Sequence, residues 1–262
     1  MSRSWQQARA LALTAELADA PPDLERHRIE GALVETTRSY PGYYFGNRFV
    51  LDEAPTAGSL DAWMARYREC FAWRSAGYPT VFSWYEPHGN ATSIGLNGID
   101  VQVMYAACDG LPAQHLALET GRIIAFSGDR HWEQLVDLEL AAYSYGKTFT
   151  RWRASSFRAL MDAGRGTYYG IVDDDGALLC AAGGYYRDEV ARFAGVITSE
   201  EHRGRGLASA LITEVLSRMR GRAKTQVIVA ERGSKAAALY ESLGFSPFCD
   251  SHSLQIGPPE AI

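Results

Sequence analysis

The sequence predicts an α+β fold in two domains, and three observations support this prediction. The chain has 262 residues, more than a single hydrophobic core of ordinary size contains. Short apolar or β-branched runs, typical of strands, alternate with longer segments of helical periodicity. In the second half, a loop rich in glycine and arginine joins a strand-like run to an amphipathic segment. The chain is therefore expected to form two domains that each contain strands and helices.

The first half of the chain is expected to contain two helices and four strands. A helix over 5–19 ends at Pro21-Pro22, and a second helix over 59–73 has Ser59 as its cap. The remaining apolar runs predict two strands within 27–53 around a turn at Pro41-Gly42, then strands at 78–85 and 101–108. The aromatic residues from Tyr40 to Phe49 are either hairpin core or the lining of a ligand site.

The second half predicts strands and helices in a different order. A strand at 122–127 leads, through Asp129 as a cap, into two helices within 130–162. The next expected elements are strands at 168–172, 177–186 and 190–198, with a hairpin turn at 173–176. The last expected elements are a helix from 206 to 219, a strand at 225–230 and a short helix within 234–245.

Composition limits the classes of function. The net charge is −5 and the basic residues are scattered, which argues against nucleic acid as a partner. Glu16 interrupts an N-terminal stretch that loosely resembles a secretion signal, and no run is long enough to span a membrane. The four cysteines are far apart and lack the spacing of metal ligands. We therefore expect a cytoplasmic protein, a monomer or homodimer, without a metal site and without a membrane partner.

The loop after the strand at 190–198 has the features of an anion site. Gly204 and Gly206 lack the Cβ atoms that would hinder close approach of a ligand to the backbone. The first N–H groups of the following helix have no intrahelical partners, and the helix dipole and the charges of Arg203 and Arg205 favour an anion there. A pyrophosphate fits these donors.

The short helix after the strand at 225–230 carries a second pattern. Ala237, Tyr240 and Leu243 recur at helical spacing, and Gly244 follows as the residue that ends the helix. With the loop, this gives strand, glycine-arginine loop, helix, strand and a short helix with a tyrosine.

In this order of parts the chain resembles the GCN5-related N-acetyltransferase (GNAT) family. The family's coenzyme A loop, Arg/Gln-x-x-Gly-x-Gly/Ala, is matched by Arg203, Gly206 and Ala208. Its late helix commonly reads A-x-x-L-Y-E-x-L-G-F, which is matched by Ala236, Leu239, Tyr240, Glu241, Leu243, Gly244 and Phe245. The first half is more weakly similar to the degenerate front half of tandem GNAT proteins. The resemblance implies two tandem GNAT-like domains, each a mixed, mostly antiparallel twisted sheet flanked by helices. It divides the chain into a degenerate domain, 1–117, and a catalytic domain, 118–262.

The resemblance implies an N-acetyltransferase that uses acetyl-CoA as a cosubstrate. Loop amides would hold the pyrophosphate, a splayed strand would pair with the pantetheine arm, and Tyr240 would protonate the leaving thiolate. The residues expected to bind the cosubstrate are Val196, Ile197, Thr198, Arg203, Gly204, Arg205, Gly206, Leu207, Ala208, Ser209 and Ser234. The acceptor is expected to be a primary amine of a small molecule or peptide, attacked directly.

Several alternatives remain open in the sequence. Many relatives have asparagine where this chain has Gly233, so the neighbouring Ser234 either replaces that hydrogen bond or only caps the helix. Tyr240 is either the acid or a packed aromatic residue. His202 is either a base or a solvent-facing residue, and Glu231 is the nearest carboxylate to the preceding strand, so no base is assigned. The competing function is a non-catalytic acyl-CoA-binding regulatory module.

Overall fold

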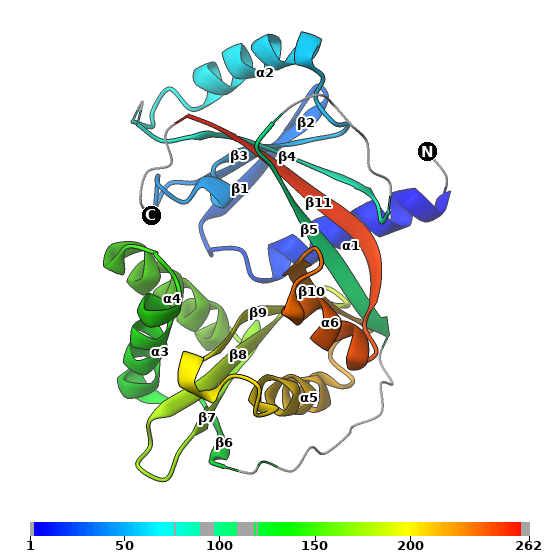
Figure 1. Cartoon of the computed structure of the whole chain (residues 1–262). Coiled ribbons are helices and arrows are strands. Elements are labelled where there is room, and N and C mark those ends of the chain that lie inside the picture. The colour runs from blue at the N-terminus through cyan, green and yellow to red at the C-terminus, as the bar shows by residue number, and fades with distance from the viewer. Residues whose placement is uncertain (1–2, 76, 90–96, 109–117, 119, 258–262) are drawn as a thin grey trace.

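A single mixed sheet runs through the whole molecule. The structure is a computed structural model, and it describes residues 3–75, 77–89, 97–108, 118 and 120–257. Eleven strands form the sheet in the order β1-β2-β3-β4-β11-β5-β10-β9-β8-β7-β6, with helices against it (Figure 1). The predicted α+β class is confirmed, and the two predicted sheets are joined edge to edge.

The elements of the first half differ from prediction in one region. They are α1 (Arg3–Ala18), β1 (Leu24–Ile29), β2 (Ala32–Thr37), β3 (Arg48–Leu51), α2 (Ala57–Cys70), β4 (Thr80–Pro87) and β5 (Ile99–Cys108). The expected turn at Pro41-Gly42 is confirmed, because the N–H of Tyr43 donates to the Tyr40 carbonyl at 2.9 Å in the connection between the antiparallel strands β2 and β3. A second turn was not predicted: β1 and β2 form a hairpin between Ile29 and Ala32, where Gly31 has a φ of +78°. Residues 41–42 lie in the connection from β2 to a 3₁₀ turn, Tyr44–Gly46.

The cap of α2 also differs from prediction. Thr56, not Ser59, is the cap residue, and its hydroxyl accepts a hydrogen bond from the backbone N–H of Ser59 at 3.2 Å. The Ser59 hydroxyl in turn accepts from the N–H of Thr56 at 2.9 Å. This reciprocal capping box explains why the sequence pattern pointed three residues too far along the chain.

The elements of the second half confirm the predicted order and add a strand. They are β6 (Arg122–Ala125), α3 (Gly128–Ala142), α4 (Lys147–Asp162), β7 (Gly166–Val172), β8 (Leu178–Arg187), β9 (Val190–Thr198), α5 (Leu207–Met219), β10 (Thr225–Glu231), α6 (Lys235–Ser242) and β11 (Ser246–Ile256). Ser127 precedes α3 as its cap residue, and Asp129 lies in the first turn instead of capping it. The added strand is β11, which was not predicted from the sequence.

The two halves of the chain exchange elements. β11 lies between β4 and β5, which belong to the first half, and β5 pairs along its length with β10 of the second half (Figure 1). Helix α1 packs against β8 and β9. The division at residue 117 stays a prediction, but the sheet and α1 cross it.

Helices pack against both faces of the sheet. On one face α5 buries its predicted apolar side, including Leu207, Leu211 and Val215, in a core shared with Tyr240 of α6. On the other face α3 and α4 pack over β7, β8 and β9, and α1 covers the centre of the sheet. Among the helices that the structure describes, none is long and apolar enough to cross a membrane.

Candidate active site between the two halves

Strands β9 and β10 separate and leave a cavity between them. They pair in parallel only where Val190–Arg192 meets Thr225–Val227. Beyond that point a cavity of about 430 Å³ is lined on one side by Phe193–Val196 and on the other by Ile228 and Val229. A volume of this size suits a small-molecule site. The splayed pair of strands that the family resemblance implied is therefore present.

A bulge in β9 shapes the wall of this cavity. Ala181 pairs with Ile197 and Gly183 with Ala194, so two residues of β9 lie opposite one residue of β8. The bulged residues are Gly195, with a φ of +60°, and Val196, and both line the cavity. The hydroxyl of Tyr168 donates to the Gly195 carbonyl at 3.1 Å and so holds the bulge. Backbone N–H and C=O groups at the bulge therefore do not follow the regular hydrogen-bond pattern between β8 and β9.

The three strand residues expected at the pantetheine arm have different surroundings. Val196 lines the cavity. The Ile197 side chain is buried in the core beneath α3 and α4, and the Thr198 hydroxyl contacts the sulfur of Cys180 at 3.2 Å. Ile197 and Thr198 can therefore contribute only backbone groups toward the cavity.

The glycine-arginine loop has an open backbone. Gly204 and Gly206 both have a φ of +76°, and a Cβ at either position would meet nothing within 4 Å. Arg203 and Arg205 are exposed, and each donates to a backbone carbonyl before the loop, that of Thr198 at 3.4 Å and that of Glu201 at 3.1 Å.

The start of α5 leaves free donors beside this loop. The first helical hydrogen bond runs from the N–H of Ala210 to the Gly206 carbonyl, so the N–H groups of Leu207, Ala208 and Ser209 precede the helical ladder. The Leu207 side chain is buried in the core and anchors this end of the helix. An open glycine backbone followed by unpaired N–H groups fits a pyrophosphate.

Helix α6 brings Tyr240 to the floor of the cavity. Ser234 caps this helix by accepting a hydrogen bond from the N–H of Ala237 at 3.1 Å, which confirms its predicted role as a cap. The Tyr240 ring packs edge to face against Tyr105, with ring centroids 6.3 Å apart, and also lines the cavity. Among the described residues, none hydrogen-bonds its hydroxyl. Burial raises the pKa of Tyr240 to about 12.

Neither residue that the sequence offered as a base lines the cavity. The His202 ring is hydrogen-bonded through Nδ1 to the Ser199 hydroxyl at 2.8 Å, and Glu231 is exposed. The carboxylate that does line the cavity is Asp19, from the end of α1. Burial raises the pKa of Asp19, although the charge of Arg192 opposes this effect. Sequence reasoning missed Asp19 because nothing local links α1 to a strand about 170 residues later.

Aromatic side chains from both halves line the outer part of the cavity. Tyr43, Tyr44 and Phe45 come from the 3₁₀ turn of the first half. They face aromatic residues of α4 and of the segment before it, namely Tyr143, Tyr145, Phe149 and Trp152. Both alternatives for the aromatic residues from Tyr40 to Phe49 therefore hold in part. Phe49 is fully buried in the core, whereas Tyr43 to Phe45 line the cavity.

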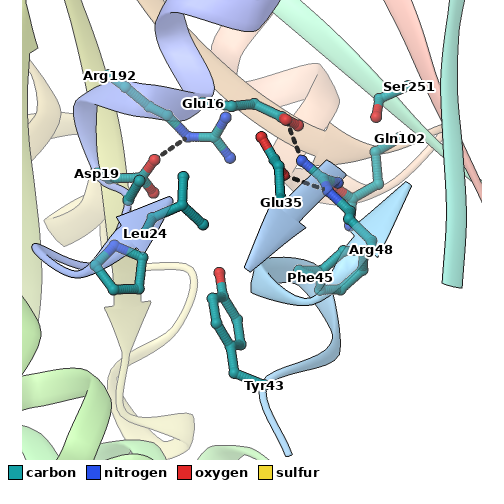
Figure 2. A pocket seen from close by; sticks show the side chains of 12 residues that line it. Glu16, Asp19, Leu24, Glu35, Tyr43, Phe45, Arg48, Gln102, Arg192 and Ser251 are labelled. Carbon is teal, nitrogen blue, oxygen red and sulfur yellow. Dashed lines mark hydrogen bonds and ion pairs between the residues drawn. The ribbon is translucent and has the colours of Figure 1, made fainter. Parts of the chain in front are cut away.

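A smaller, charged cavity continues from the first between α1 and the sheet. It has a volume of about 130 Å³ and is lined by charged residues of α1, β2, β3 and β9 (Figure 2). These charged residues are Glu16, Asp19, Glu35, Arg48 and Arg192. We call this space the inner cavity and the larger one the outer cavity.

Comparison with known proteins agrees with this geometry. Residues 132–245 match the sequence model of the acetyltransferase (GNAT) family. The second half of the chain is therefore similar to the GNAT family over these residues. No curated protein matches the chain by sequence.

Solved structures extend the likeness to the whole chain. A functionally unknown conserved protein from Staphylococcus epidermidis has a TM-score of 0.73 at 12% identity and covers 90% of this chain and 95% of its own. A GCN5-related N-acetyltransferase from Kribbella flavida has a TM-score of 0.68 at 18% identity, covering 98% and 97%. A tandem GNAT protein from the clavulanic acid biosynthesis pathway has a TM-score of 0.60 at 16% identity, covering 98% and 95%. At these identities the likeness shows a shared tandem fold.

Proposed function

We propose that this protein transfers an acetyl group from acetyl-CoA to a primary amine by direct attack. The observation that carries the proposal is the cavity at the splay of β9 and β10, because it is lined by both the bulge at Gly195-Val196 and by Tyr240. Acetyl-CoA would supply an activated carbonyl and a thiolate leaving group. We expect this reaction to take place in the cytoplasm.

The residues of this chain would act in three ways. The backbone of Gly204 to Ser209 would bind the pyrophosphate, which fixes the cosubstrate outside the cavity. A backbone N–H at the bulge, near Val196, would donate to the developing oxyanion. Tyr240, which stays protonated at neutral pH, would donate its proton to the departing thiolate. Residues of both halves line the site, and a bound cosubstrate between them would displace water from the thioester.

Calorimetric titration of CoA tests the binding part of this proposal. Gly206→Val should reduce affinity by at least a hundredfold, because a side chain would block the pyrophosphate and strain a left-handed backbone. The matched control is Gly164→Val, since Gly164 also has a left-handed φ of +71° and open space around it but lies at the end of α4. Arg203→Ala should weaken binding less, by about 1 to 2 kcal/mol.

The stoichiometry and the turnover complete the test. We expect one CoA per chain, because among the described residues only the loop at 203–206 combines two glycines and two arginines with the start of a helix. Release of free thiol from acetyl-CoA over a panel of amines separates an enzyme from a binding module. CoA affinity that is equal in the wild type and Gly206→Val would refute the loop assignment. CoA binding without amine-dependent thiol release would instead favour the regulatory module.

A further inference from the structure

The inner and outer cavities share part of their lining. The shared residues are Asp19, Pro21, Tyr43, Phe45, Gln102 and Arg192. The outer cavity contains the bulge of β9 and Tyr240, where the proposed chemistry takes place. A substrate whose amine lies at this end therefore has room to extend its other end toward the inner cavity.

Most charges in the inner cavity are already paired with one another. Arg48 donates through Nε to Glu35 at 2.8 Å, through Nη1 to Ser83 at 3.2 Å and through Nη2 to Glu16. The second oxygen of Glu35 accepts from Arg26 at 2.9 Å. All three guanidinium nitrogens of Arg48 and both oxygens of Glu35 thus have partners. Each nitrogen of Arg48 therefore already has an acceptor within the protein.

Arg192 is the exception in this cluster. Its Nε forms an ion pair with an Asp19 oxygen at 3.1 Å, but among the described residues neither Nε nor the buried Nη1 has a hydrogen-bond partner. The side chain keeps 18% of its surface exposed and lines both cavities. Figure 2 shows the outer nitrogens of its guanidinium directed into the inner cavity, with the hydroxyl of Tyr43 pointing into the same space. An arginine is always charged, and an incompletely paired one in a buried site is costly unless a ligand completes it.

The unpaired donors, and not the net charge, decide which ligand group this site favours. Three carboxylates, Glu16, Asp19 and Glu35, are balanced by three arginines, since Arg48 pairs with both glutamates, Arg26 also pairs with Glu35, and Arg192 pairs with Asp19. An ammonium group would compete with those arginines, whereas an anionic oxygen would meet free donors on Arg192. A guanidinium binds a carboxylate in a planar, directional geometry.

We propose that the acceptor is an amino acid-like molecule, a primary amine that also bears a carboxylate, and that Arg192 and Tyr43 bind this carboxylate in the inner cavity. Asp19 acts as a positioning residue because its ion pair orients the guanidinium of Arg192. This inference rests on the proposed function and adds the chemical class of the acceptor.

Matched pairs of amines test the proposal with the full chain and saturating acetyl-CoA. Each pair consists of an amine that bears a carboxylate and its decarboxylated counterpart: 5-aminopentanoate and butylamine, 6-aminohexanoate and pentylamine, lysine and cadaverine. We expect kcat/KM from thiol release to be about ten- to a hundredfold higher for the carboxylate-bearing member of at least one pair, the range of a charge-assisted hydrogen bond. Calorimetric binding of the same compounds to the CoA complex gives a readout that does not depend on turnover.

Variants of Arg192 identify the group that recognises the carboxylate. Arg192→Gln should bring the ratio of kcat/KM within a pair close to one, and Arg192→Lys should give an intermediate ratio because it keeps the charge but not the planar fork. If Arg192→Gln fails to fold, the double variant Asp19→Asn/Arg192→Gln replaces it, because it leaves no unpaired carboxylate. Arg187→Gln is the matched control, since this exposed arginine at the end of β8 should leave the ratio unchanged.

The outcomes separate this inference from the proposed function. If amines release thiol without any preference for a carboxylate and bind without one, the acceptor class is wrong and the acetyltransferase proposal stands. A preference that persists in Arg192→Gln would overturn the role of Arg192. If acetyl-CoA does not bind or no amine releases thiol, the proposed function fails and this inference fails with it.

Discussion

The Tyr240 side chain belongs both to the hydrophobic core and to the candidate active site. Its ring packs against Tyr105 and Phe245 in the core, while the residue also lines the outer cavity. The sequence left two interpretations of this tyrosine, a packed aromatic and an acid. The structure makes them compatible, because packing fixes the ring and leaves the hydroxyl without a partner among the described residues.

Replacing Tyr240 by phenylalanine tests the acid role. The ring packing is kept and only the hydroxyl is lost, so we expect kcat to fall about 10²- to 10⁴-fold with little change in CoA affinity. Tyr105→Phe is the control, since it removes a neighbouring hydroxyl from the same aromatic contact. Steady-state kinetics measure both. An unchanged kcat in Tyr240→Phe would mean that water, not this phenol, protonates the thiolate.

The pKa of Tyr240 adds a prediction about pH. Burial raises it to about 12, above the usual value of 10.0, so the phenol keeps its proton throughout an ordinary assay range. Loss of the acid by ionisation should therefore not reduce kcat between about pH 8 and pH 10. A rate that falls there with the titration of one group, and does not fall in Tyr240→Phe, would contradict the raised pKa.

At the scale of elements, the bulge in β9 depends on a close contact with β7. Gly195 has a left-handed φ, and a Cβ there would lie 2.2 Å from the hydroxyl oxygen and 3.3 Å from Cζ of Tyr168. Tyr168 is fully buried, so its ring has little space to move. Both the backbone conformation and the packing therefore require glycine at this position.

Gly195→Ala should destabilise the protein by about 2 to 4 kcal/mol, from backbone strain and overpacking together. Tyr168→Phe in the same chain should recover part of this loss, because it removes the atom of closest contact, although it also removes the hydrogen bond to the Gly195 carbonyl. Urea unfolding of the two single variants and the double variant gives the coupling. Strictly additive effects would mean that the clash with Tyr168 does not determine the cost.

At the scale of the whole molecule, the exchange of strands makes the halves interdependent. β5 is the neighbour of both β10 and β11, and β4 is the other neighbour of β11. A fragment that begins at residue 118 lacks β4, β5 and α1, so it would expose both edges of β11 and one edge of β10. Unpaired edges of this length favour aggregation.

We therefore expect the fragment 118–262 to be insoluble or to lack a cooperative thermal transition. Circular dichroism and size-exclusion chromatography of the purified fragment measure this, with the full chain as the reference. A soluble fragment that melts cooperatively would show that the second half folds without its exchanged partners.

Local features of the sequence determined much of the second half of the protein. Its strands and helices lie close to their predicted bounds, because the periodicity of each segment reports which face is buried. The loop at 203–206 and the helix with Tyr240 also follow from short spacings, since left-handed glycines and a capped helix need only neighbouring residues. In the first half, Pro41-Gly42 correctly marked the turn between β2 and β3. The hairpin at Gly31 was missed because its first strand, β1, is rich in charged residues and lacks the apolar alternation of a strand.

Only the tertiary structure decided what unites the two halves. The place of β11 between β4 and β5 depends on hydrogen bonds between segments more than 130 residues apart, and no local pattern encodes such a pairing. The pair Asp19–Arg192 and the contact of Tyr43 with Trp152 arise in the same way, from α1 and a 3₁₀ turn folded against the second half. The sequence by itself thus determined the candidate cosubstrate loop, and the folding of one half against the other built the cavity proposed for the acceptor.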